Sequence, residues 1–180
     1  MKEDKHRCMI GDAFDDAASE LQKKVTSSKE VVSSMLNDFV NRRARGESPT
    51  SLQFNATSTN SDSVHLMIPA IVNRSFAVEQ YLKALYFNEN QETHTKNGRQ
   101  IHKLDKIFFD LKPETQEIIR RKINLSENEF ENEISKIATD FVEWRYLEHA
   151  MDGSNVARNT GFTTALAKAL RDLCQSEICN

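Results

Sequence analysis

Hydrophobic residues recur at three- and four-residue steps along most of this chain, which is the period of an amphipathic α-helix. The first such segment covers residues 12–40, with apolar positions at Phe14, Ala17, Ala18, Leu21, Val25, Val32, Leu36 and Phe39 or Val40. Serine pairs at 27–28 and 33–34 weaken this pattern. The sequence therefore predicts a long first helix with a kink or break near its middle.

Residues 41–63 have a different character. They include Gly46, Pro49 and many Ser, Thr and Asn residues, and they show no helical period. This composition is typical of a long loop or a disordered linker. The following segment, 65–88, is apolar around much of its circumference, which predicts a central helix. Pro69 falls in its first turns, where a missing N–H costs little.

The second half of the chain predicts shorter helices separated by polar loops. The polar loop at 88–100 leads into a short helix over 102–111, and Pro113 opens another that ends near Ile123. Ser126 and Glu129 form a capping-box pattern that starts a helix running to about Met151, and Gly153 stops it. A last helix has apolar positions at Phe162, Leu166, Ala169, Leu170 and Leu173.

No segment shows the two-residue period of a strand, so the fold class is all-α. We expect a single domain over residues 1–180, built as a roughly antiparallel helical bundle with a long polar loop after the first helix. Only 5 Gly and 3 Pro punctuate the 180 residues, which agrees with few turns and long elements.

Charge and cysteine content narrow the functional classes. The net charge of -3 gives no global basic field for nucleic acid, although a local basic patch such as Arg42, Arg43 and Arg45 could still contact phosphate. The three cysteines, Cys8, Cys174 and Cys179, are far apart in sequence and include no C-x-x-C. We therefore expect a reduced, cytoplasmic protein without a disulfide framework. The sequence also lacks a secretory signal and a membrane-length apolar run.

Arg145 and His149 are the first candidates for chemistry. They stand four residues apart in a predicted helix and so share one face, with Glu148 beside them. A His can act as an acid or base while an Arg stabilises a phosphate. The alternative is an ordinary polar helix edge in which Arg145 pairs with a carboxylate.

A second candidate pair is Glu79 with Lys83, which has the order and spacing of a stabilising helix pair. Its position inside a largely apolar helix is unusual, and we expect a structural role rather than a catalytic one. His102, followed by Lys103, stands at a helix start, where it could cap the helix or point into a cleft. The sequence has no H-x-x-x-H, H-E-x-x-H or phosphate loop, so neither a metal site nor a cofactor is expected.

Three segments in order resemble the HEPN superfamily of helical-bundle domains. They are N-R-S-F-A-V-E-Q-Y-L-K-A-L at 73–85, I-H-K-L-D-K-I-F-F-D-L at 101–111 and F-V-E-W-R-Y-L-E-H at 141–149. The resemblance covers residues 64–173. It implies a helical bundle that often dimerises, and for many members a metal-independent RNase in toxin–antitoxin, phage-defence or CRISPR-linked systems.

The resemblance also implies roles for particular residues. In the RNase members, an Arg and a His on a late helix meet their copies at a dimer cleft, and Arg145 and His149 match them by type and position. Glu148 would orient His149, and His102 or Lys103 would line the cleft. Only three residues separate Arg145 from His149, fewer than the family's four to six.

The sequence thus leaves three hypotheses open. The first is a homodimeric, metal-independent endoribonuclease that acts on RNA and has an antitoxin or defence partner. The second is a non-catalytic HEPN-like module that binds a nucleotide, a protein or its own copy. The third is a structural adaptor in which residues 41–63 form a tether. None of them involves a membrane.

Overall fold

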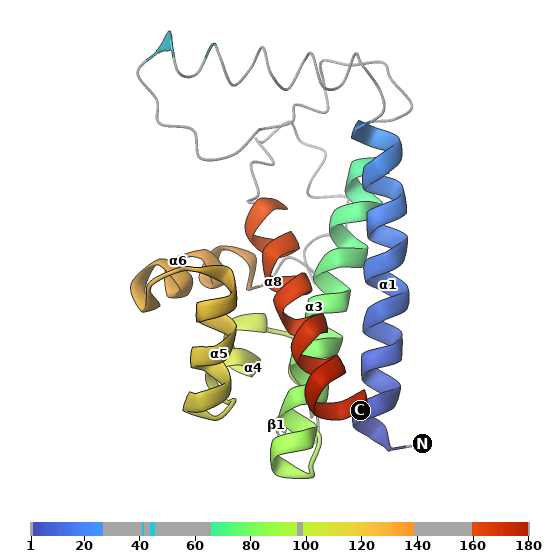
Figure 1. The fold of residues 1–180 in the computed structure, drawn as a ribbon, viewed down its shortest axis with the longest axis vertical. Helices are drawn as coiled ribbons and strands as arrows, with labels where there is room; N and C mark the ends of the chain where they lie inside the picture. The colour runs from blue at the N-terminus through green and yellow to red at the C-terminus, as the bar shows by residue number, and fades with distance from the viewer. Residues whose placement is uncertain are drawn as a thin grey trace.

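Three helices that are far apart in sequence lie side by side in the computed structural model of the chain (Figure 1). They are α1 (Glu3–Thr26), α3 (Met67–Asn90) and α8 (Thr160–Cys174). The structure describes residues 2–26, 41, 44–45, 66–96, 99–138 and 160–179. In Figure 1, α1 runs in the opposite direction to both α3 and α8. The expected all-α architecture is therefore confirmed.

Helix α1 begins nine residues earlier than the apolar pattern predicted, at Glu3 rather than Asp12. Two features explain the earlier start. Glu3 and Asp4 place negative charge in the first turn, where the helix dipole favours it. Cys8 is buried in the core, and Arg7 Nη1 donates to Gln80 Oε1 of α3 at 3.2 Å. Tertiary contacts thus stabilise a segment whose own apolar signal is weak.

Helix α3 lies between its neighbours, as its apolar circumference predicted. It packs against α1 on one side and against α8 and α4 (Leu104–Phe109) on others. Pro69 is the third residue of the helix, inside the first turn as expected. Gln91 ends the helix in the left-handed conformation, with φ 57°, and its N–H donates to the carbonyl of Phe87.

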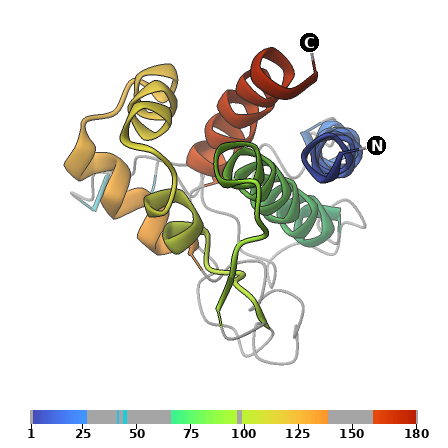
Figure 2. The ribbon, with the colours of Figure 1, turned by 90° about the horizontal axis from the view of Figure 1, so that it is seen from below.

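A second group of helices covers the side of α3 and α8 that faces away from α1 (Figure 2). It consists of α4, α5 (Pro113–Ile123) and α6 (Glu127–Ile137). The capping box predicted at the start of α6 is present, since Glu129 N–H donates to Ser126 Oγ and the Glu129 carboxylate accepts from Ser126 N–H. The predicted continuation of this helix to Met151, and its stop at Gly153, lie outside the described residues.

The polar loop after α3 contains a minimal strand pair that the sequence analysis did not predict. Strand β1 (Thr95–Lys96) pairs antiparallel with β2 (Arg99–Gln100). Each strand has only two residues, so the all-α assignment is unaffected. Helix α8 begins where the apolar pattern placed it, and a π-helical turn, η3 (Gln175–Cys179), follows it. The proposed loop at 41–63 lies almost wholly outside the described residues.

Aromatic side chains join the two groups of helices. The rings of Phe108 and Phe130 have centroids 4.5 Å apart, and Phe130 and Phe162 have centroids 5.4 Å apart. These residues come from α4, α6 and α8, and all are buried. The phenylalanines therefore supply the contact between the outer helices and the three long ones.

Candidate functional site

The centre of α3 holds a buried ion pair. Lys83 Nζ lies 2.7 Å from Glu79 Oε1, and the two side chains are only 3% and 1% exposed. The four-residue spacing places both on one face of the helix, and the order Glu then Lys suits the helix dipole. Both charges are removed from water, so each depends on the other for compensation. The predicted pair is thus confirmed as a buried salt bridge.

His102, in the loop before α4, also contacts Glu79. Its Nδ1 lies 3.0 Å from Glu79 Oε1, the same oxygen that accepts from Lys83. A carboxylate paired with an ammonium group only accepts hydrogen bonds, so Nδ1 is the protonated nitrogen. The other ring nitrogen, Nε2, takes no part in this contact. We call Glu79, Lys83 and His102 the Glu79 cluster.

The Glu79 cluster connects the interior to the surface. The His102 side chain is 42% exposed, whereas Glu79 is almost fully buried. His102 neither caps α4 nor stands alone, because the N-cap position belongs to Lys103 and shows no side-chain capping bond. Lys103 is exposed and follows His102 in the sequence. It does not take part in the hydrogen bonds of the Glu79 cluster.

Two buried polar atoms, one in the Glu79 cluster and one beside it, have no hydrogen-bond partner in the part of the chain that the structure describes. They are the second carboxylate oxygen of Glu79 and the hydroxyl of Ser75, one helical turn earlier. A buried polar group without a partner costs about 1–3 kcal/mol. These two groups therefore cost stability among the described residues.

The start of α4, which follows His102 in the sequence, is bonded to the end of α6. Leu104 N–H donates to the carbonyl of Ala138 at 3.1 Å, which joins the start of α4 to the end of α6. In the sequence, Arg145 follows Ala138 by seven residues. Arg145, Glu148 and His149 themselves lie outside the described residues, so their predicted roles stay predictions.

His94 lies in the loop after α3, and it is buried. Its Nε2 lies 2.7 Å from Asp110 Oδ2, and its ring packs edge-on against Tyr86 with centroids 4.5 Å apart. His94 therefore fixes the loop after α3 against the end of α4. His6, in α1, is exposed.

A polar network joins α1, α3 and α8, and the sequence did not predict it. Arg171 of α8 contacts three carboxylates of α1: its Nε lies 3.1 Å from Asp12, and its Nη1 lies 3.3 Å from Asp15 and 2.6 Å from Asp16. The Tyr81 hydroxyl donates to the same Asp12 oxygen at 2.7 Å. Burial, followed by this carboxylate, raises the pKa of Tyr81 above its ordinary value.

Arg74 extends the network along α3. Its Nε lies 3.5 Å from Asp15, and its Nη2 donates to Ser19 Oγ at 3.1 Å. The sequence signal was the run of three aspartates within one and a half turns of a predicted helix. The sequence could not identify Arg171 as their partner, because it lies more than 150 residues away from them. The network joins the three long helices, so we assign it a structural role. The Glu79 cluster is therefore the candidate site.

Two general features of the described residues bear on function. No group of three or more His, Cys, Asp or Glu residues in the described ranges is arranged to hold a metal ion. None of the described helices combines the length and apolar character needed to cross a membrane.

Comparison with protein-family models, curated proteins and solved structures gave no match to this chain.

Proposed function

We propose that this chain is a HEPN-like, metal-independent endoribonuclease that cleaves RNA at a cleft between two copies. The observation that supports it best is the Glu79 cluster. Two of the three HEPN-like segments meet there through the bond between Glu79 and His102. The all-α fold is compatible with the proposal. The sequence of the third segment supplies the Arg and His that the chemistry requires.

The proposed reaction uses two side chains. Arg145 binds the scissile phosphate and balances the charge that develops on it. His149 acts as the general base that removes the proton from the ribose 2′-OH, whose oxygen attacks phosphorus. The 5′-oxygen leaves with a proton from an acid, which the second copy of His149 supplies. The products are a 2′,3′-cyclic phosphate and a 5′-hydroxyl.

The Glu79 cluster has a supporting role in this proposal. His102 stands at the surface with Nδ1 bound to a buried carboxylate, so its orientation is fixed from the interior. Its Nε2 edge and the neighbouring Lys103 would contact the RNA backbone. Lys83 pairs with Glu79, so the buried pair adds no net negative charge near RNA.

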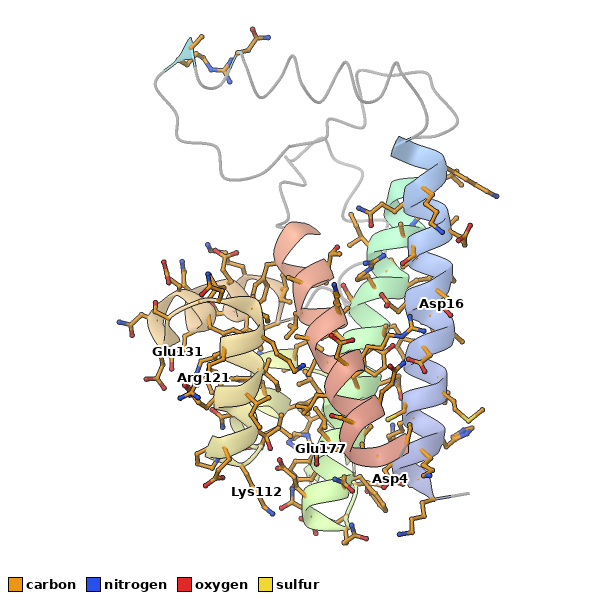
Figure 3. The ribbon with its side chains drawn as sticks, in the orientation of Figure 1. Asp4, Asp16, Lys112, Arg121, Glu131 and Glu177 are labelled. Atoms are coloured by element: carbon orange, nitrogen blue, oxygen red, sulfur yellow. The ribbon has the colours of Figure 1, made fainter. Side chains whose placement is uncertain are left out.

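The experiment is a cleavage assay in excess EDTA with total RNA and a defined tRNA. It compares the wild type with the Arg145→Ala/His149→Ala double variant. A matched control removes the same two residue types elsewhere: Arg121, on the outer side of α5 (Figure 3), and His6, exposed on α1. We expect the wild type and the Arg121→Ala/His6→Ala control to cleave alike and the site variant to be inactive. Equal cleavage by all three would overturn the proposal.

A non-catalytic binding module is the second candidate, and one observation favours it. The Glu79–Lys83 pair is fully enclosed, as expected for a structural ion pair. In this alternative, the late helices bind a nucleotide, a protein or a second copy without chemistry. It predicts a defined complex with no RNA cleavage, measured by light scattering and by binding of labelled nucleotides.

A further inference from the structure

The outer face of α5 carries an exposed isoleucine between two opposite charges. Ile118 is the sixth of the 11 residues of the helix, and it is 42% exposed, although isoleucine is among the residues most often buried. Glu114 precedes it by four residues and Lys122 follows it by four, and both are exposed. Residues four apart are neighbours on a helix surface, so the three side chains form one stripe. Figure 3 shows the neighbouring Arg121 on the side of α5 that faces away from the three long helices.

The two charges of this stripe differ from the other charged side chains of α5. Glu117 lies 3.3 Å from Arg120 and 2.7 Å from Arg121, so these three side chains compensate one another. Within the part of the chain that the structure describes, Glu114 and Lys122 form no ion pair. The helix therefore leaves one carboxylate and one ammonium group available to a partner.

This arrangement is complementary to itself. When two copies of a helix pack antiparallel about a two-fold axis, residues at equal distances before and after the axis face each other. With the axis at Ile118, the two isoleucines meet, and each Glu114 faces the partner's Lys122. Each charge lies about 6 Å along the helix from the axis, and packed helices are about 8–10 Å apart, which a Glu–Lys pair can span. The antiparallel helix dipoles also attract each other.

We propose that the outer face of α5 binds a second copy of this chain, with Ile118 on the two-fold axis and two reciprocal Glu114–Lys122 ion pairs. The surface is separate in sequence from Arg145 and His149, so the inference goes beyond RNA cleavage and does not depend on it. Helix α5 is only about 16 Å long, which gives a contact smaller than the roughly 800 Å² per partner of a standard interface. We therefore expect a weak dimer that salt weakens further by screening the ion pairs.

Charge reversal tests the reciprocal pairing. Glu114→Lys gives a copy with two lysines beside Ile118, and Lys122→Glu gives a copy with two glutamates. Each variant alone places like charges opposite each other, so we expect its Kd for self-association to rise by at least about 10-fold in analytical ultracentrifugation. An equimolar mixture of the two variants restores both attractions and should associate as tightly as the wild type. Circular dichroism checks that each variant keeps its helices.

Cross-linking tests the position of the axis. Ile118→Cys is made in the Cys179→Ser background, which removes the exposed native thiol, while Cys8 and Cys174 are buried. We expect a short bismaleimide to join this variant to its own copy. Met9→Cys in the same background is the matched control, because Met9 is also an exposed apolar residue, at 57%, but belongs to α1. The control should stay uncross-linked.

Four results would overturn the proposal. They are a chain that remains monomeric up to about 1 mM, charge-reversal variants that each associate like the wild type, a mixture that associates no more tightly than its components, and equal cross-linking from positions 118 and 9. A dimer formed through another surface would give the second result. RNA cleavage is measured separately, so the failure of either proposal leaves the other standing.

Discussion

His102 Nδ1 and Glu79 Oε1 lie 3.0 Å apart, although 23 residues separate them in sequence. The contact joins a half-exposed imidazole to a carboxylate in the middle of the central helix. The same oxygen accepts from Lys83, so one buried atom organises three charged or polar side chains. The candidate site therefore depends on the integrity of the α3 ion pair.

The ion pair gives the first prediction. Lys83→Met leaves the Glu79 carboxylate buried without its cation, and we expect a loss of about 3 kcal/mol in the free energy of unfolding. The double variant Glu79→Gln/Lys83→Met should recover much of this loss, because no unpaired charge remains. Urea unfolding followed by circular dichroism measures both.

The control for this prediction is the exposed pair Lys23–Glu20 on α1, whose atoms are 2.6 Å apart. Lys23→Met should leave the unfolding midpoint almost unchanged, since solvent screens a surface pair. If Lys83→Met were no more harmful than Lys23→Met, the buried pair would not be interdependent as described.

A close approach between α1 and α3 gives the second prediction. A Cβ on Gly11 would lie 2.6 Å from Cε1 of the Tyr81 ring, which is fixed by burial and by its bond to Asp12. Alanine is normally preferred to glycine in a helix by about 1 kcal/mol. Here we expect Gly11→Ala to lower stability instead, by about 1–3 kcal/mol, because the two helices must separate.

Gly161, an exposed position in α8, supplies the matched substitution. Gly161→Ala should leave thermal stability unchanged or raise it slightly, as helix propensity requires. A stabilising effect of Gly11→Ala of the same size would contradict the close packing of Tyr81 on α1.

Acid titration gives the third prediction. The hydrogen bond from Arg171 lowers the pKa of Asp16 below its ordinary value of 3.8. A lowered native pKa contributes stability that is present above the unfolded value and is lost as pH falls through the native value. Asp16→Asn should therefore reduce the urea midpoint at neutral pH, and the difference should shrink as pH falls below about 4. The effect will be small, because the Asp16 side chain is 64% exposed.

Arg171→Met provides the corresponding control. In that background, Asp16→Asn should no longer change the shape of the pH profile. A pH-dependent difference of undiminished size would show that another group, rather than Arg171, stabilises the ionised carboxylate.

Local sequence signals predicted those parts of the fold that depend on local chemistry. The capping box at Ser126 and Glu129, the start at Pro113 and the apolar positions of α8 each act within one or two turns. The early start of α1 was missed because it depends on the burial of Cys8 in the core and on the bond from Arg7 to Gln80 of α3. The period of apolar residues within one segment does not predict contacts with distant segments.

The sequence predicted the candidate site only in part, because some of its contacts join distant segments. The spacing of Glu79 and Lys83 identified their pair, since four residues make one helical step. The bond from His102 to Glu79 and the bond from His94 to Asp110 each join different segments of the chain. Such contacts depend on how the helices pack, which no single segment specifies.

The central claim is tested most directly by the initial rate at which one defined tRNA is cut in excess EDTA by the wild type and by His149→Ala. General acid–base catalysis typically contributes about 10²–10⁴-fold, so we expect the variant to be slower by at least about 100-fold. The fragments made by the wild type should end in a 2′,3′-cyclic phosphate. Cleavage by His149→Ala at the wild-type rate, or its complete absence in both proteins, would contradict the proposed ribonuclease.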